Sequence, residues 1–295
     1  MLKNQERRII MSKNKSMKYQ AQGILKPMLR LGESKHDAKL KAEDKHHIEG
    51  IFSTSTYKNY VTVAVQFGNW AKKTHGEKDL NNCRQYVAEY LQIRIDKGLS
   101  PDTVKRDVSA LAKLYKCTGK DFGIDIPKMI RSEITRSRKE VKGFDYNKHK
   151  DVLDYINGTS HRRSELLRSK KKYYTEVNGE IIVRIIGKGG KIRYSKVLPQ
   201  YKEFVRSRLQ GLKDEDKVFR PSEVPVRTPC HAYRAKYAKD YYNMIARPLN
   251  TLTTKEKYIC RKDKKGTVYD REALAVVSKM LGHNRLSVIV DHYLY

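Results

Sequence analysis

The sequence has no apolar run long enough to cross a membrane, and only four cysteines and one tryptophan among 295 residues. The only apolar island near its start, residues 9–11, is shorter than the core of a signal peptide, so we expect a cytoplasmic protein. The cysteines (Cys83, Cys117, Cys230 and Cys260) lie far apart with no CxxC pair. This spacing favours structural thiols over a disulfide framework or a zinc site, and no metal is expected.

Acidic residues are scarce relative to basic ones. Lys and Arg number 63 against 33 Asp and Glu, which gives a formal net charge of +30 at pH 7. Such an excess repels itself in the compact state, and a polyanionic partner relieves that repulsion. The sequence contains no Lys-rich amphipathic helix with Trp or Phe on its apolar face, so it gives no indication of binding to a membrane surface. Nucleic acid is therefore the expected partner, with a nucleoid-associated location and no membrane.

Composition and periodicity divide the chain into four segments. Residues 1–50 are Lys-rich with weak apolar spacing, which predicts a basic N-terminal arm or extension. Residues 51–117 carry helical periodicity and predict a small bundle. Residues 118–144 contain Gly, Pro and a basic run and predict a linker. Residues 145–295 mix helical and strand patterns, so the fold class is mostly α with a small antiparallel β-sheet.

Capping residues mark two helix starts in the expected bundle. Ser53 and Ser55 are N-cap candidates for one helix, and Ser100 followed by Pro101 marks another. A helix between them is expected over 82–97. Basic side chains outside the apolar stripes are candidates for contact with DNA phosphates, although simple solvation of the surface is the alternative for most of them. These are Lys58, Lys72, Lys73, Lys105, Arg106 and Lys113.

The second domain is expected to contain both helices and hairpins. A helical pattern from Val152 is expected to break at Asn157-Gly158. Strands are predicted over 173–177, 181–186 and 192–197, with a two-residue turn at Asn178-Gly179. Helices are predicted over 201–212, 229–244 and 270–281, and a further hairpin over 258–269 in an excursion of no evident role.

Four short motifs follow one another along this domain. They are RRSELL at 162–167, GKG at 187–189, HAYR at 231–234 and LGH at 281–283, with Tyr293 ten residues beyond the last histidine. Taken singly, each has an ordinary structural explanation, since Tyr293 is one of 20 tyrosines and GKG is a turn. Their joint order and spacing make the set specific.

In these motifs residues 50–295 resemble the tyrosine recombinases, the phage integrase family that includes Xer recombinases and conjugative-transposon integrases. The resemblance implies a helical core-binding (SAM-like) domain over 51–117 and a mixed α/β catalytic domain over 145–295. It also implies an active site made of Arg162, Lys188, His231, Arg234, His283 and Tyr293, supported by Glu165. The implied reaction cuts and rejoins DNA through a 3′-phosphotyrosine without metal, ATP or any other cofactor.

The chemistry of these residue types fits that reaction. Two guanidiniums can clamp the non-bridging oxygens of a phosphodiester with paired hydrogen bonds, and Glu165 could orient Arg162. His231 and His283 can donate to phosphate oxygens or move the proton of the nucleophile. Lys188 would protonate the departing 5′ oxygen. Lys191 and Arg193, which follow on the same hairpin, are further candidates for contact with DNA.

Two departures from the family pattern leave alternatives open. Thr159-Ser160-His161 stands where the family usually has Thr-Gly-aliphatic, so Arg163 is the alternative to Arg162. Tyr295 competes with Tyr293 as the nucleophile, although the offset from His283 favours Tyr293.

The expected function is site-specific recombination that integrates or excises a mobile element. The expected assembly is a homotetramer on two paired double-stranded sites, with accessory DNA-bending or excision factors. The alternatives are an inactive DNA-binding regulator of the same fold and a relaxing enzyme of the type IB topoisomerase kind.

Overall fold

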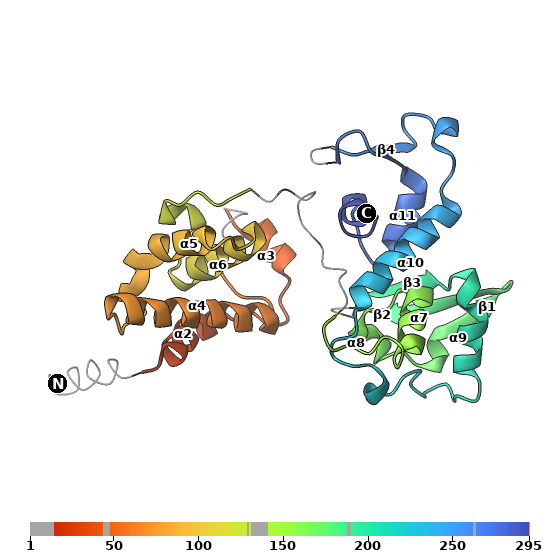
Figure 1. Cartoon of the computed structure of the whole chain (residues 1–295), viewed down its shortest axis with the longest axis horizontal. Coiled ribbons are helices and arrows are strands. Elements are labelled where there is room, and N and C mark those ends of the chain that lie inside the picture. The colour runs from red at the N-terminus through yellow and green to blue at the C-terminus, as the bar shows by residue number, and fades with distance from the viewer. Residues whose placement is uncertain are drawn as a thin grey trace. The chain divides into compact units, whose positions relative to one another are not determined.

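The computed structural model of the chain describes residues 15–43, 48–128, 130, 141–187, 190–261 and 264–294 (Figure 1). Its internal contacts divide the chain into two compact units, Met1–Met129 and Ile130–Tyr295. Within the described ranges, no helix combines the length and the apolar character needed to cross a membrane.

The first unit is helical. Its helices are α2 (Met17–Leu25), α3 (Lys35–Lys41), α4 (Thr54–His75), α5 (Val87–Asp96) and α6 (Pro101–Leu114), with the 3₁₀ turns η1 (Lys26–Met28), η2 (Asn82–Tyr86) and η3 (Gly119–Phe122). The predictions of Ser53 and Ser100 as N-caps are confirmed, whereas the other candidate, Ser55, lies inside α4. The hydroxyl of Ser53 accepts from the amide of Thr56 at 3.1 Å, and that of Ser100 accepts from Thr103 at 3.3 Å.

The core of this unit extends beyond the segment expected from the sequence. Met17, Ala21 and Leu25 recur every fourth residue along α2 and are buried against α4. A Cβ on Gly68 of α4 would lie 2.8 Å from Met17 Sδ, so glycine permits this close approach. At the other end Phe122 is buried in the same core. Residues 17–25 therefore belong to the packed bundle rather than to a loose basic arm.

The second unit combines helices with two small sheets. Its helices are α7 (Lys150–Thr159), α8 (Arg163–Leu166), α9 (Lys202–Leu209), α10 (Cys230–Ile245), α11 (Arg271–Met280) and α12 (Leu286–His292), with the turns η5 (Lys171–Tyr173), η7 (Pro199–Tyr201), η8 (Pro221–Glu223) and η9 (Leu249–Thr251). The strands β1 (Tyr174–Val177), β2 (Glu180–Ile186) and β3 (Ile192–Lys196) form one antiparallel sheet. The strands β4 (Lys257–Ile259) and β5 (Val268–Asp270) form another. The predicted fold class, mostly α with small antiparallel sheets, is confirmed.

The predicted break at Asn157-Gly158 is wrong, because α7 runs on to Thr159. Gly158 is part of the packed face of α7, since a Cβ there would lie 2.7 Å from the Cβ of Tyr201. The helix ends at Ser160, which takes a left-handed conformation with φ of +65°. This turn directs the chain from α7 toward Arg162.

The strand β3 has its polar side chains inward. Arg193 and Ser195 are buried, whereas Ile192 and Tyr194 are 50% and 60% exposed. A strand on a hydrophobic core normally alternates the other way. The inverted pattern indicates that this face of β3 lines a polar site rather than the apolar core.

Candidate active site

Glu165 is the centre of a buried charge cluster in the second unit. Its Oε1 lies 2.6 Å from Arg162 Nη1, and its Oε2 lies 2.8 Å from Arg193 Nη2 and 3.8 Å from Arg234 Nη1. The Glu165 side chain is only 1% exposed. The cluster thus brings together residues from α8, β3 and α10, which are far apart in sequence, and pairs Glu165 with Arg162.

The Glu165 carboxyl is ionised at neutral pH. Burial acts to raise its pKa, but the Arg193 guanidinium, the Arg162 backbone amide, and the charges of Arg234 and Arg162 outweigh burial and lower the pKa to about 2. Three guanidiniums and one carboxylate give these four residues a net charge of +2. A net positive pocket of this kind suits a phosphodiester.

Arg193 has a different role from the one expected. Its Nη1 donates to the Met280 carbonyl at 2.8 Å and to Ser160 Oγ at 3.2 Å, and its Nη2 donates to the Ser160 carbonyl at 3.1 Å. Burial lowers its pKa to about 10. The prediction that Arg193 contacts DNA is wrong, because its guanidinium is buried and bound to protein oxygens. Arg193 instead holds Glu165 and the end of α11 in place.

Arg234 is the most enclosed member of the cluster. Its side chain is fully buried, its Nη2 donates to the Leu281 carbonyl at 2.9 Å, and its Nη1 donates to the Ser160 carbonyl. Its Nε has no hydrogen-bond partner among the described residues. Because buried donors are normally hydrogen-bonded, we expect Arg234 Nε to bind an acceptor when a ligand occupies the site.

His283 and Tyr293 lie in contact. His283 Nε2 is 3.1 Å from Tyr293 Oη, and the Tyr293 ring lies over Arg234, with 5.8 Å between Arg234 Cζ and the ring centroid. Tyr293 follows α12 directly and is only 7% exposed. Desolvation, then Arg234, Arg162 and Arg193, lower the pKa of His283 to about 4. The imidazole is therefore neutral at pH 7 and able to accept a proton.

Glycine is required in the Leu-Gly-His motif. Gly282 has φ of +71°, in the left-handed region, and a Cβ there would lie 2.9 Å from Arg193 Cδ. The next residue, His283, donates its backbone amide to the Ser278 carbonyl at 2.8 Å. The motif thus lets the chain pass close to Arg193 and aims His283 at Tyr293.

His231 and Lys188 complete the predicted set. His231 lies at the start of α10 and is exposed, and partial desolvation with the charges of Arg234 and Arg162 lowers its pKa. Lys188 lies outside the described residues. The residue before it, Gly187, lies beside the cluster, because a Cβ there would be 3.4 Å from Glu165 Oε1.

The departure at His161 has a structural explanation. His161 is buried, and burial followed by the charge of Arg193 lowers its pKa to about 3. The Thr159 hydroxyl donates to the Tyr155 carbonyl at 2.6 Å, so it accepts from His161 Nδ1 at 2.8 Å. A neutral histidine with a satisfied Nδ1 replaces the aliphatic side chain usual in the family. The sequence contained no signal for this role.

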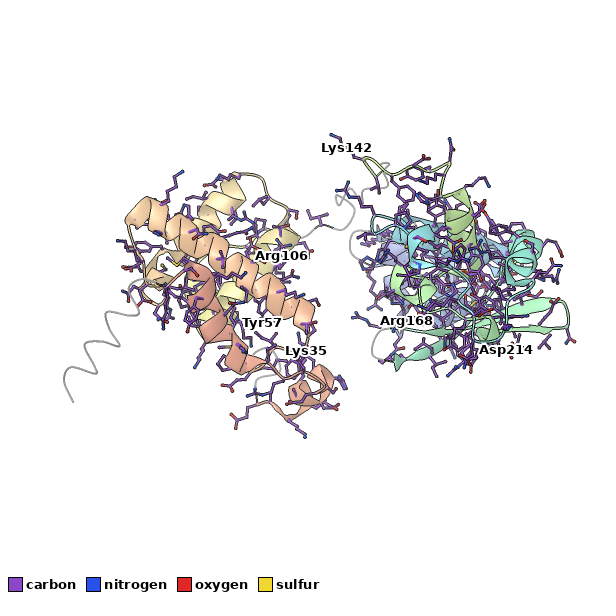
Figure 2. All side chains as sticks on the ribbon, turned by 90° about the horizontal axis from the view of Figure 1, so that it is seen from below. Lys35, Tyr57, Arg106, Lys142, Arg168 and Asp214 are labelled. Carbon is purple, nitrogen blue, oxygen red and sulfur yellow. The ribbon has the colours of Figure 1, made fainter. Side chains whose placement is uncertain are left out.

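The candidates for contact with DNA differ in their accessibility. Lys58, Lys72, Lys73, Lys105 and Lys191 are exposed. Arg106, labelled in Figure 2, is half exposed beside Asp107. Lys113 is an exception, since its ammonium donates to the Ile48 carbonyl at 2.6 Å. The ammonium of this half-buried side chain is thus engaged within the helical unit, which it stabilises, and we no longer expect it to contact a DNA phosphate.

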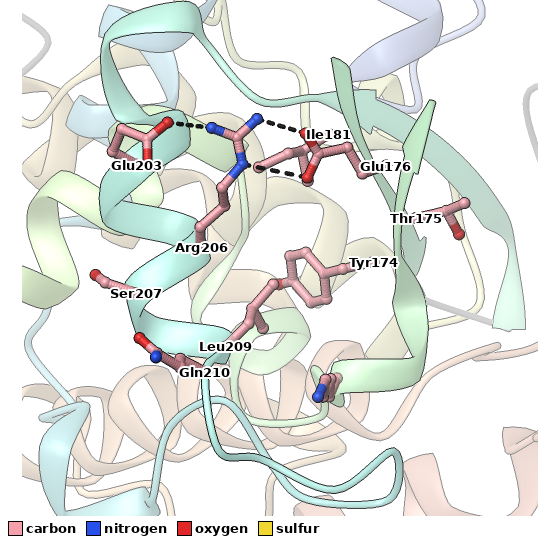
Figure 3. Close-up of a pocket in the computed structure, with 10 residues that line it drawn as sticks. Tyr174, Thr175, Glu176, Ile181, Glu203, Arg206, Ser207, Leu209 and Gln210 are labelled. Carbon is pink, nitrogen blue, oxygen red and sulfur yellow. Dashed lines mark hydrogen bonds and ion pairs between the residues drawn. The ribbon is translucent and has the colours of Figure 1, made fainter. Parts of the chain in front are cut away.

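A cavity of about 510 Å³ in the second unit is lined by none of the motif residues. It lies between β1 and α9, where Arg206 bridges Glu176 and Glu203 (Figure 3). Arg206 is already paired with these two carboxylates, so we assign this cavity no role in the chemistry. Within the described ranges, no group of three or more His, Cys, Asp or Glu side chains could hold a metal ion.

No family model and no curated protein matches the sequence. Among solved structures the chain is similar to the XerH site-specific recombinase bound to a palindromic difH substrate, at 15% identity over 94% of this chain and 89% of that one, with a TM-score of 0.49. It is also similar to a variant of the Tn1549 transposon integrase in complex with a circular intermediate DNA, at 13% identity over 95% of each chain and a TM-score of 0.46. The XerA recombinase is a third, at 14% identity over 82% of this chain and 88% of that one, with a TM-score of 0.30.

These neighbours are all named as recombinases or integrases, the class of protein that the sequence resembles. The function proposed below rests on the geometry of the site rather than on these likenesses.

Proposed function

We propose that this chain is a site-specific DNA recombinase of the tyrosine type, which cuts and rejoins DNA through a 3′-phosphotyrosine on Tyr293. The observation that supports this most directly is the 3.1 Å separation of His283 Nε2 from Tyr293 Oη beside a cluster of three arginines. A tyrosine, a neutral imidazole and two guanidiniums available for phosphate are the groups that such a transfer needs.

In the proposed cleavage step, Tyr293 Oη attacks the phosphorus and its proton passes to His283. The bond from phosphorus to the 5′ oxygen breaks, and that oxygen takes a proton from Lys188. The new O–P bond stores the energy of the phosphodiester, so a 5′ hydroxyl from another strand can reverse the step and rejoin the DNA. Each bond broken is matched by one formed, so no oxidant, nucleotide or other co-reactant is needed.

The arginines stabilise the charge that develops on the non-bridging oxygens. The Arg162 side chain is 31% exposed and available, whereas Arg234 lies beneath the Tyr293 ring. A phosphate that enters beside Arg162 therefore reaches Arg234 through a shift of the Tyr293 ring that keeps its hydroxyl beside His283, and the unpaired Nε of Arg234 can then donate to it. The negative phosphate also raises the basicity of His283 at the moment when it takes the proton.

The same reasoning extends to partners and setting. We propose double-stranded DNA as the substrate, a homotetramer on two paired sites as the active assembly, and accessory DNA-bending or excision factors as further partners. The basic N-terminal segment and the excursion at 248–268 favour integration or excision of a mobile element. Location in the cytoplasm on the nucleoid follows from a DNA substrate.

A nicked suicide substrate tests the proposal. DNA bound by the full chain is first selected from a random pool, and the selected site is then offered as a duplex nicked beside each phosphate in turn. Wild type should form a covalent adduct that is lost in Tyr293→Phe and kept in Tyr241→Phe, a buried tyrosine with no part in the site. Binding without any adduct would indicate a DNA-binding regulator instead. Relaxation of supercoiled DNA without recombinant products would indicate a topoisomerase-like enzyme.

A further inference from the structure

The excursion between α10 and α11 is closed at its base by a double ion pair. Arg247 Nε and Nη2 donate to Asp270 Oδ2 and Oδ1 at 2.8 and 2.9 Å, and the Arg247 amide donates to Oδ2 at 3.0 Å. Asp270 is 1% exposed and caps α11. Arg247 Nη1 also reaches Glu256 Oε1 at 2.9 Å. The excursion therefore leaves and rejoins the unit at one fixed point.

Its hairpin donates side-chain hydrogen bonds to the segment 286–294, chiefly from one lysine. Lys264 Nζ donates to the Val290 carbonyl at 2.6 Å and to the Leu294 carbonyl at 3.2 Å. The Tyr269 hydroxyl donates to the same Leu294 carbonyl at 3.4 Å. These acceptors lie on either side of Tyr293, three residues before it and one residue after it.

The hairpin also shares an apolar cluster with this segment. Cys260 is buried together with Tyr293 and Leu294, and Tyr258 and Tyr269 pack against the same cluster. The hairpin thus meets the segment through both side-chain packing and hydrogen bonds.

The segment needs such support. Helix α12 has only seven residues, and a helix that short is unstable by itself in water. The Val290 carbonyl belongs to its last turn, where carbonyls lack partners within the helix and a cation is favourable. The Lys264 ammonium supplies both a hydrogen-bond donor for this carbonyl and a positive charge at the C-terminal end of α12, which leads directly into Tyr293.

We propose that Lys264 is a positioning residue, through which the β4–β5 hairpin holds the segment 286–294 so that the hydroxyl of Tyr293 stays beside His283. Lys264 touches no reacting atom and acts on the reaction only through the backbone on either side of the tyrosine. Its catalytic consequence rests on the function proposed above, whereas the anchoring itself does not.

The test compares Lys264→Met with Lys265→Met in the full-length chain. Methionine keeps most of the stem of lysine and removes its ammonium, and Lys265 is the exposed neighbour on the same hairpin. Amide hydrogen exchange in peptides covering 286–294 should speed up at least about tenfold in Lys264→Met and stay at the wild-type rate in Lys265→Met. Equal exchange in the two variants would overturn the anchoring, whether or not the protein is a recombinase.

A second readout measures the reaction. At saturating protein on the nicked selected site, the single-turnover rate of adduct formation should fall about tenfold to a hundredfold in Lys264→Met, because a displacement of about 1 Å at a reacting group has effects of this order. Lys264→Arg, which keeps a charged donor, should recover most of the rate. Faster exchange with an unchanged adduct rate would overturn the positioning role. A wild type that forms no adduct would refute the recombinase function and leave the exchange result to decide the anchoring.

Discussion

Arg193 Nη2 lies 2.8 Å from Glu165 Oε2, with both side chains almost wholly enclosed by protein. The pair joins β3 to α8, and the other terminal nitrogen of Arg193 holds the Met280 carbonyl at the end of α11. One guanidinium therefore links α8, which begins directly after Arg162, to the turn that carries His283. The geometry of the site depends on this buried residue as much as on the groups that would touch DNA.

Removing the cation of that pair should destabilise the second unit. Arg193→Met leaves the Glu165 carboxylate buried, with Arg162 still at Oε1 but only Arg234, 3.8 Å away, as a guanidinium near Oε2. Breaking a buried pair from one side costs about 3–5 kcal/mol. The free energy of unfolding in urea measures this loss. Lys191→Met, an exposed residue two positions earlier, should change it by less than about 0.5 kcal/mol. Equal losses in the two variants would contradict the role given to Arg193.

The neighbours Arg162 and Arg163 should separate into one catalytic and one structural residue. Arg162 is partly exposed beside Glu165, whereas Arg163 donates to the Pro225 and Val224 carbonyls at 2.8 and 2.9 Å. Arg162→Ala should lower the rate of adduct formation by about 10²–10³, with a smaller loss of stability than Arg193→Met because the Arg162 side chain is partly exposed. Arg163→Ala should lower the midpoint of thermal unfolding, with a smaller effect on the rate among folded molecules. The opposite pattern would make Arg163 the catalytic arginine.

Stability should fall in mild acid because of His161. Its pKa is about 3 in the folded state against an ordinary value of 6.5, so below pH 6.5 the unfolded chain takes up a proton that the folded chain refuses. Stability is therefore full above pH 6.5 and falls by up to about 1.4 kcal/mol per pH unit as the pH drops toward 3. His283, with its pKa near 4, contributes in the same direction.

Urea titrations between pH 6.5 and 4.5 measure this slope. His161→Gln should reduce this slope of unfolding free energy against pH by about half, and the remainder should be the contribution of His283. A wild-type stability that does not vary over this range would contradict the burial of a neutral His161.

The salt dependence of DNA binding should distinguish the lysines of the first unit. Each phosphate contact contributes about 0.9 to the slope of log K against log salt concentration. Lys72→Ala and Lys73→Ala remove exposed charges and should reduce the slope, by up to about one each. Lys113→Ala should leave the slope unchanged and cost about 1 kcal/mol of stability, because its ammonium binds the Ile48 carbonyl. Fluorescence anisotropy over a series of salt concentrations measures these slopes.

Much of the fold followed from local signals. Ser53 and Ser100 cap the helices they were expected to cap, and the hairpins and the last three long helices lie close to their predicted ranges. Local chemistry fixes these features, since a serine hydroxyl satisfies a free amide at a helix start and Asn178-Gly179, with φ of +51° and +70°, forms the two-residue turn between β1 and β2. The order of the motifs likewise predicted that Arg162, Glu165 and Arg234 come together, and that Tyr293 lies beside His283.

The errors arose where tertiary packing decides. Gly158 looked like a helix breaker but is the small residue that lets α7 approach Tyr201. Arg193 looked like one more basic residue on a hairpin, because its burial depends on Ser160 and Glu165 from distant parts of the chain. Met17, Ala21 and Leu25 lie in a Lys-rich segment, so their burial was not predicted. In each case the deciding partner lies far away in sequence, so no local pattern contains it.

The identity of the tyrosine that bonds to DNA is the most direct test of the central proposal. Wild-type adduct trapped on the nicked selected site is digested with a protease and a nuclease, and mass spectrometry locates the nucleotide remnant. The remnant should be on Tyr293, with a matching loss of adduct in Tyr293→Phe. A remnant on Tyr295 or on any other residue, or an adduct that persists in Tyr293→Phe, would contradict the assignment of Tyr293 as the nucleophile.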